Sequence, residues 1–349
     1  MEQAWPSPST KQKSPLFVSL GMTVLDELHF SSRETLYNVP GGSGLYATLG
    51  ARLMDSTVGA VILTGKGFPE TVMDQIKQWD VTLKVKNLPN SPSTRGFLQH
   101  KDESGQRTFR YLTPPLQPHP SDLQNSPLIR SRGFHFLVRP ELLQEMADSL
   151  LSLRSLVGER RPLIVWEPAP LFCKKDLLEQ HLQACKLVDV FSPNHLELES
   201  LTADGPCDGD LPFSREDVEC RARLFLDAGI GLDKDGLVVV RCGEHGCMTL
   251  SRKTGVDWLP AFFDSTSPVV VDTTGAGNVF LGAFTVAFLK TDDAREAAIA
   301  GSVAASFAIE QIGLPDFSPA SSAKETWNGV DVSTRLAEYR VRLSGSEKD

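Results

Sequence analysis

The sequence lacks any uninterrupted apolar run long enough to cross a bilayer. Its first 15 residues are polar, rich in Ser and Pro, and lack the apolar core of a secretory signal, so we expect a disordered tail over 1–15. It also lacks an excess of positive charge, with 35 Lys and Arg against 44 Asp and Glu and a net charge of −9. We therefore expect a cytoplasmic protein with no nucleic acid and no membrane as partner.

Cysteine pairs at metal-binding or redox spacing are missing as well. The six cysteines all lie in the second half of the chain, and none forms a C-x-x-C pair or a zinc-type set with histidines. They are Cys173, Cys185, Cys207, Cys220, Cys242 and Cys247. We expect reduced and mostly buried thiols. A dinucleotide-binding dehydrogenase is disfavoured, because the first apolar segment ends in Gly21-Met22-Thr23 with no G-x-G-x-x-G after it.

Apolar segments typical of strands alternate with helical patterns along the 349 residues. The expected strands are Leu16–Leu20, Val58–Leu63, Gly133–Val138, Leu163–Trp166, Val188–Ser192 and Leu237–Arg241. The expected helices are Leu45–Met54, Thr71–Trp79, Glu141–Leu156, Lys175–Cys185, Asn194–Leu201, Arg215–Ala228, Asn278–Leu289 and Ala294–Gln311. Such alternation predicts an α/β protein with a doubly wound, mostly parallel sheet that helices cover on both faces.

Two further segments do not fit that layered sheet and predict a small β lid. They lie near 24–39 and 95–112, and the second contains the turn Asp102-Glu103-Ser104-Gly105. We expect one domain over 16–320 and a C-terminal extension over 321–349.

Four loops follow expected strands or lid segments, at the places where α/β proteins bind ligands. They are Gly41–Gly44, Pro193–Glu197, Gly243–Gly246 and Gly275–Asn278. The last is the most informative, because a strand-like run, Val269–Val271, precedes it and an apolar helix follows it. That arrangement directs backbone N–H groups and the positive end of a helix dipole at one point, which favours binding of an anion such as a phosphate.

The order of these four loops resembles that of the ribokinase-like, PfkB-type carbohydrate kinases, over about Leu16 to Pro315. The resemblance implies a doubly wound sheet with a small β lid over the acceptor. It implies an enzyme that transfers the γ-phosphoryl group of ATP to a hydroxymethyl group of a small-molecule substrate. The implied cofactors are ATP and Mg²⁺, often with a monovalent cation such as K⁺. Lid strands also suggest a homodimer, because an exposed β edge can pair with a second copy.

On this resemblance, Asp26 binds hydroxyl groups of the substrate, and Gly41 and Gly42 allow the substrate to approach the backbone. Asp26 is equally consistent with a solvated loop carboxylate, and the two glycines with a simple turn. Ser43 and Tyr46 stand where the ribokinase branch has Lys and Asn. That departure suggests an acceptor that is bulkier or less polar than ribose.

The resemblance makes Gly275, Ala276 and Gly277 the anion hole for the transferring phosphoryl group. It links Asp272 and Thr274 to a site for the monovalent cation.

The resemblance also assigns two loops to the nucleotide side. Asn194 and Glu197 match an N-x-x-E motif that holds Mg²⁺ through water, although the same spacing also fits a helix capping box. Gly243 and Gly246 match the turn whose backbone meets the nucleotide, and a plain turn after a strand explains them nearly as well.

Asn278 departs from the family, which has an aspartate there to accept the proton of the attacking hydroxyl. An amide cannot act as a general base, and losing the base typically slows a reaction by about 10²–10⁴-fold. We therefore expect a slow kinase, with Asn278 also serving as a helix N-cap. Asp26, a carboxylate from the lid or a phosphate of the substrate are the alternatives for the missing base. One alternative is an inactive nucleotide- or sugar-binding pseudokinase with a regulatory role. Another is a different reaction on the same scaffold, such as dehydration or ligation.

Overall fold

Nine strands form the main sheet of the computed structural model, which describes residues 14–30, 33–100, 107–203, 212–264, 266–320 and 324–346. In spatial order they are β13 (Gly255–Leu259), β12 (Cys247–Ser251), β11 (Leu237–Arg241), β10 (Val190–Phe191), β9 (Leu163–Pro168), β8 (Gly133–Val138), β1 (Phe17–Ser19), β4 (Gly59–Lys66) and β5 (Thr82–Pro92). The seven strands from β11 through β1 to β5 in this spatial order pair in parallel with their neighbours. Strands β12 and β13 extend the sheet beyond β11 as an antiparallel edge. The predicted doubly wound, mostly parallel sheet is confirmed.

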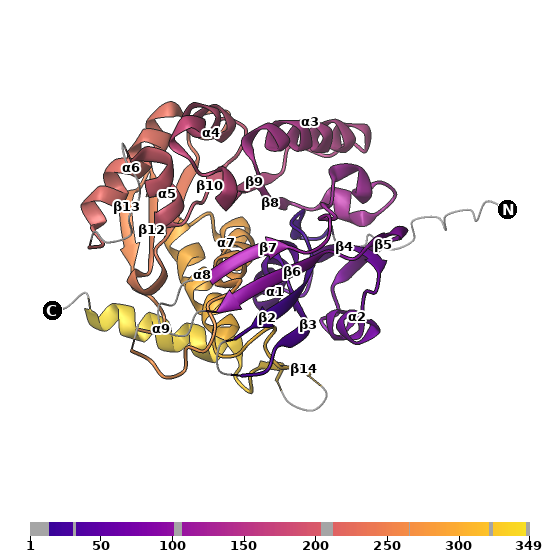
Figure 1. Cartoon of the computed structure of the whole chain (residues 1–349). Helices are drawn as coiled ribbons and strands as arrows, with labels where there is room; N and C mark the ends of the chain where they lie inside the picture. Colours follow the sequence, from indigo (N-terminus) through magenta and orange to yellow (C-terminus); the bar gives the residue numbers. More distant parts are fainter. Residues whose placement is uncertain are drawn as a thin grey trace.

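Helices cover both faces of this sheet (Figure 1). They are α1 (Ser43–Met54), α2 (Glu70–Lys77), α3 (Pro140–Leu156), α4 (Leu178–Cys185), α5 (His195–Thr202), α6 (Arg215–Ala228), α7 (Ala276–Thr291), α8 (Ala294–Ala308) and α9 (Val332–Ser346). Neighbouring residues of one strand face opposite layers: Val238 and Val240 belong to the apolar cluster that contains residues of α3, α4 and α6, whereas Val239 belongs to the cluster that contains residues of α1, α7 and α8. The strands are therefore apolar on both faces, as buried parallel strands should be.

A second, smaller sheet has four strands in the order β3 (Leu36–Gly41), β2 (Val24–His29), β6 (Arg95–His100) and β7 (Arg107–Tyr111). Strands β6 and β7 are antiparallel, as predicted, while β2 and β6 are parallel. The predicted turn at 102–105 lies outside the described residues, as do residues 1–13 of the predicted tail and Cys207. We call this four-stranded unit the small sheet.

One predicted strand is wrong. Val269–Val271 precedes α7 as a turn and loop, because the N–H groups of Val271 and Asp272 donate to the Ile309 carbonyl (2.7 and 3.2 Å) and pair with no strand. The neighbouring helix boundaries also shift: α7 begins at Ala276 and α8 ends at Ala308.

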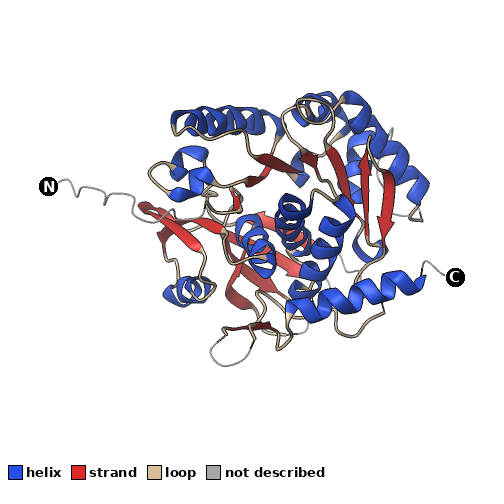
Figure 2. Cartoon of the chain, turned by 180° about the vertical axis from the view of Figure 1, so that it is seen from behind, coloured by secondary structure: helices blue, strands red, loops and turns tan. Residues whose placement is uncertain are grey.

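Several elements were not predicted, namely β5, β12, β13 and α9. Helix α9 lies at the outside of the molecule, next to the C-terminus (Figure 2), and packs on α8. A short antiparallel pair, β14 (Phe317–Ser318) and β15 (Thr326–Trp327), precedes it. No helix in the described ranges combines the length and apolarity that a membrane span requires.

The prediction for the cysteines is largely confirmed within the described part of the chain. Cys173, Cys185, Cys242 and Cys247 are buried free thiols, and Cys220 is an exposed one. Burial raises the pKa of Cys242 and of Cys247 to about 12, so both stay protonated at neutral pH.

Candidate functional site

The connections of the main sheet reverse direction at β1, which pairs with β4 on one side and β8 on the other. In open α/β sheets, ligands bind beyond the carboxyl ends of the strands at such a point. Three polar side chains lie on neighbouring strands here: Ser19 of β1, His135 of β8 and Glu167 of β9. Ser19 Oγ lies 2.9 Å from His135 Nδ1, and His135 Nε2 lies 3.2 Å from Glu167 Oε2. All three residues are buried.

Glu167 is an ionised carboxylate with three partners. Arg241 Nη1 lies 2.9 Å from its Oε1, while His135 and the Asn278 amide hydrogen-bond its Oε2, the amide at 2.5 Å. Burial alone would raise the pKa of Glu167, but Arg241 and the hydrogen bonds from His135 and Asn278 hold that pKa below its usual range. The sequence analysis missed this residue, although it is a charged residue at the end of a buried apolar strand.

Arg241, at the end of β11, joins Glu167 to the predicted N-x-x-E motif. Its Nη2 lies 3.5 Å from Glu197 Oε2 and donates to the Ser192 carbonyl at 3.0 Å. Its Nε is buried and has no partner among the described residues. Arg241 was also missed by the sequence analysis.

Asn194 and Glu197 form the capping box that their spacing allows. Asn194 Oδ1 accepts the Glu197 N–H at 2.8 Å, and Glu197 Oε2 accepts the Asn194 N–H at 2.7 Å, so α5 begins at His195. Burial raises the pKa of Glu197 to about 7, and the Glu167 carboxylate adds to this rise while Arg241 opposes it. The carboxylates of Glu167 and Glu197 thus share the single guanidinium of Arg241, so an additional cation would be favourable beside them.

The N-terminus of α7 adjoins this charged group. Gly275, with φ of 77°, caps the helix and Asn278 is its third residue, so the prediction of Asn278 as N-cap is wrong. The amide is instead free to reach Glu167. A Cβ atom at Gly275 would overlap the Tyr46 ring, and one at Gly277 would overlap Arg241 Nη1, so both side chains lie against this turn.

A cavity of about 420 Å³ opens beside the same turn. It brings together four predicted residues, namely Gly243, Gly246, Ala276 and Gly277, with Arg241 next to them. Apolar side chains complete its wall: Phe262, Phe263, Val270, Phe280 and Ile309. The N–H groups in the first turn of a helix have no partners within the helix. The Ala276 N–H donates to the Thr273 carbonyl at 3.3 Å, so an anion in this cavity would meet the Gly277 amide and a guanidinium.

Asp26 of β2 lies on the small sheet, between two glycines. A Cβ atom at Gly41 or at Gly96 would overlap one of its carboxylate oxygens. The residue is 7% exposed, its Oδ1 has no partner in the described part of the chain, and burial, with the Asp272 carboxylate, raises its pKa to about 7. A buried oxygen without a partner, in space that only glycine leaves open, is suited to accept a hydrogen bond from a ligand.

Tyr46, on α1, connects Asp26 to the anion-binding turn. A Cβ at Gly41 would lie 3.6 Å from its Cε2, and the same ring packs on Gly275. Gly42 precedes α1 with φ of 90°, and Ser43 is the first residue of that helix. The predicted acceptor residues and the predicted anion hole are therefore neighbours.

Asp272 and Thr274 shape the turn before α7. Asp272 Oδ1 accepts the Thr274 N–H at 3.0 Å and its hydroxyl at 2.8 Å. Within the described ranges, no group of three or more His, Cys, Asp and Glu side chains is placed to hold a metal ion.

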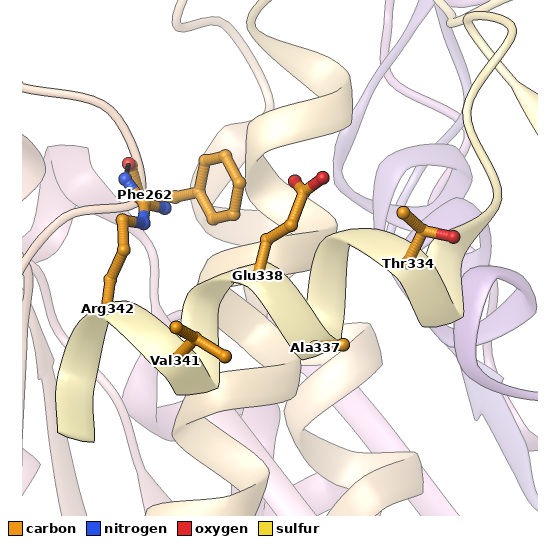
Figure 3. A pocket seen from close by; sticks show the side chains of 6 residues that line it. All are labelled: Phe262, Thr334, Ala337, Glu338, Val341 and Arg342. Atoms are coloured by element: carbon orange, nitrogen blue, oxygen red, sulfur yellow. Dashed lines mark hydrogen bonds between the residues drawn. The ribbon is translucent and has the colours of Figure 1, made fainter. Parts of the chain in front are cut away.

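Helix α9 supports one wall of the cavity. A shallower hollow of about 780 Å³ lies over α9, and Figure 3 shows Glu338 and Arg342 on the side of this helix that faces Phe262. Arg342 donates to the Phe262 carbonyl at 2.8 Å and lies 4.4 Å from the centre of its ring. Because Phe262 lines both hollows, α9 holds a residue of the 420 Å³ cavity in place.

The fold and this arrangement define an α/β protein in which the turn at 275–277 lies between two candidate ligand sites. Residues 20–320 match the model of the pfkB family carbohydrate kinases. The chain belongs to that family, so the expected class of protein, a kinase, is confirmed. An uncharacterized protein of Schizosaccharomyces pombe is 31% identical over 95% of this chain and 94% of its own.

Solved structures agree on the fold. A ribokinase from Giardia lamblia has a TM-score of 0.68 at 15% identity, with 95% of this chain and 99% of that chain covered. A ribokinase from Arabidopsis thaliana, complexed with ribose and ATP, has a TM-score of 0.61 at 18% identity, with 86% and 94% covered.

Proposed function

We propose that this protein is an ATP-dependent phosphotransferase that acts on a primary alcohol of a sugar, nucleoside or related small metabolite. One observation carries the proposal: the turn at Gly275–Gly277 adjoins a nucleotide-sized cavity through Gly277 and, through Tyr46, the buried Asp26 carboxylate. A phosphoryl group at that turn would lie between a donor and an acceptor.

ATP would occupy the 420 Å³ cavity, with the base against its apolar wall and the phosphates at the start of α7. Arg241 would bind a phosphate oxygen there, because its charge attracts phosphate and its Nε has no partner among the described residues. Gly243 and Gly246 would allow the nucleotide close to the backbone. The ribokinase complexed with ribose and ATP supports this assignment by analogy of fold.

The acceptor would lie under the small sheet, which then acts as the lid. Asp26 would accept a hydrogen bond from an acceptor hydroxyl, and Gly41 and Gly42 would leave room for it. The Tyr46 ring and Ser43 favour an acceptor that is bulkier or less polar than ribose.

Mg²⁺ would be held through water by Glu197. This fits the residues present, because Mg²⁺ usually keeps several waters and binds one or two carboxylates plus substrate phosphates. It also fits the local charge of two carboxylates against one guanidinium. When bound, the ion would neutralise charge on the phosphates. A monovalent cation such as K⁺ would lie at Asp272 and Thr274.

Asn278 itself cannot accept a proton, so turnover would be slow unless another carboxylate acts as the base. Positioning and electrostatic stabilisation by the anion hole remain, and phosphoryl transfer depends mainly on these. We further propose a cytoplasmic location and a homodimer formed through the open edges of the small sheet, strands β3 and β7.

Calorimetric titration with ATP and Mg²⁺, followed by ADP release over a panel of primary alcohols, tests the function. We expect ATP binding, and ADP release that rises with one class of alcohol above the rate without acceptor. Glu141→Gln, an exposed change on α3, is the matched control and should leave both unchanged. ATP binding without turnover on any alcohol would favour the pseudokinase alternative, and no ATP binding would overturn the nucleotide assignment.

A further inference from the structure

Glu167 and Asn278 form a buried pair of a carboxylate and an amide at the start of α7. Asn278 must present its NH₂ group to Glu167, because an ionised carboxylate only accepts hydrogen bonds. The amide oxygen then remains to accept a hydrogen bond from a hydroxyl group. Asn278 Nδ2 donates to Glu167 Oε2 at 2.5 Å, so a hydroxyl group beside this amide is also close to the carboxylate, and its single proton can be donated to either of the two.

The hydrogen bonds of Glu167 leave space for one more donor. An ionised carboxylate offers about four acceptor positions. The contacts in the described part of the chain use three of them, for Arg241, His135 and Asn278. The fourth acceptor position would serve a substrate hydroxyl, and Arg241, His135 and Asn278 could all keep their contacts.

A series of buried hydrogen bonds through His135 and Ser19 holds the Glu167 side chain in position. Its partner His135 is wholly buried and is itself held by Ser19 Oγ, whose other contact is the N–H of Gly21. This series of hydrogen bonds joins β1, β8 and β9, which are paired neighbours at the reversal point of the sheet. A base that is held in this way needs little rearrangement when the substrate binds.

We propose that Glu167, presented by Asn278, is the proton acceptor of the phosphoryl transfer. This inference rests on the proposed function. The acceptor oxygen forms a bond to the γ-phosphorus of ATP, and the bond from that phosphorus to the β–γ bridging oxygen breaks, so its electron pair leaves with ADP. The hydroxyl proton passes to the Glu167 carboxylate and from there to solvent after the product leaves.

Exchange of the two side chains tests this role. Glu167→Gln keeps the size of the side chain and removes the base, so kcat should fall by about 10²–10⁴-fold with little change in the affinity for ATP. Asn278→Asp alone places two carboxylates in one hydrogen bond, so one must hold a proton, and we expect no gain in kcat. The double variant Glu167→Gln/Asn278→Asp restores one carboxylate and one amide with their places exchanged, and should recover at least tenfold over Glu167→Gln.

Three results would overturn the inference. A Glu167→Gln variant that keeps a third or more of the wild-type kcat would remove Glu167 from the reaction. A double variant that binds ATP yet stays as slow as Glu167→Gln would show that the carboxylate acts only in structure. Wild-type protein that binds ATP but phosphorylates no alcohol would overturn the proposed kinase activity itself, and Glu167's role with it. ATP titration and thermal unfolding of each variant establish that it is folded, and Glu141→Gln again serves as the control.

Discussion

Replacing Asp26 with asparagine should stabilise the folded protein at neutral pH while weakening acceptor binding. The Asp26 carboxyl is 7% exposed, and burial, with the charge on Asp272, raises its pKa from 3.8 to about 7. An acid whose pKa is raised by folding is more easily kept protonated in the folded chain than in the unfolded one. Ionising it near pH 7 therefore costs folding free energy.

The direction of the pH dependence follows from proton counts. Between about pH 4 and pH 7 the folded chain binds more protons at Asp26 than the unfolded chain does, so the free energy of unfolding falls as the pH rises. Above about pH 7 this loss is complete. At about 1.4 kcal/mol per pKa unit, a rise from 3.8 to about 7 corresponds to about 4 kcal/mol. Rearrangement of side chains and water around the charged form relieves part of this cost, so we expect about 2–4 kcal/mol.

Urea unfolding at pH 4.5, 6 and 7.5 measures this effect. The Asp26→Asn variant should differ little from wild type at the lowest pH and exceed it by about 2–4 kcal/mol at the highest. Glu197, whose pKa burial also raises to about 7, contributes in the same direction and remains in both proteins. Asp233→Asn, at an exposed position, is the control and should not change the pH dependence. Equal stability of wild type and Asp26→Asn at pH 7.5 would refute the reasoning.

Two further changes test the cavity and the C-terminal helix. Gly277→Ala places a Cβ on Arg241 Nη1, so ATP affinity should fall at least about tenfold, and the melting temperature should also fall because the same atom pairs with Glu167; unchanged affinity in calorimetry would contradict the proposed phosphate site. Arg335→Ala leaves Glu310, its partner at 2.8 Å, without a counter-ion and should destabilise the fold by about 3 kcal/mol in urea unfolding. The exposed pair made by Arg340 is the control, and Arg340→Ala should cost less than about 1 kcal/mol. Equal effects of the two arginine variants would show that α9 does not brace the core.

The sequence predicted the layered sheet because its central strands are continuous apolar runs bounded by turns. Leu237–Arg241 was predicted and observed with the same bounds. Val269–Val271 has the same residue types, yet it forms no strand. The Ile309 carbonyl, just after the end of α8, accepts hydrogen bonds from the N–H groups of Val271 and Asp272. A short apolar run cannot reveal which partner its N–H groups will find. Strand β5 was missed for a different reason: it lies at an open edge and many of its residues are exposed.

The local motifs of the site could be predicted from the sequence, whereas the contacts between residues far apart in the sequence could not. Asn194 and Glu197 are three residues apart, so one sequence window contains their whole capping box. Asn278 and Glu167 are 111 residues apart, and only the order of the strands brings them together. The sequence analysis allowed for a substitute base but did not identify Glu167, because this carboxylate belongs to a strand whose neighbours the sequence did not define.

The pairing of Glu167 with Asn278 also accounts for Arg241 and for the glycine at 277. A carboxylate buried at the end of β9 requires a counter-ion, since an uncompensated buried charge would be strongly destabilising. Arg241 supplies that charge from the end of β11, and its guanidinium reaches Glu167 through space that a side chain at position 277 would fill. If the base lies on the strand, the arginine and the glycine are required together. A carboxylate at position 278 alone would instead sit at the positive end of α7, where the helix dipole already favours it. The double variant Glu167→Gln/Asn278→Asp should therefore lose less stability than wild type when Arg241 is replaced. Measuring the effect of Arg241→Gln on the free energy of unfolding of both proteins distinguishes a carboxylate at position 167 from one at position 278.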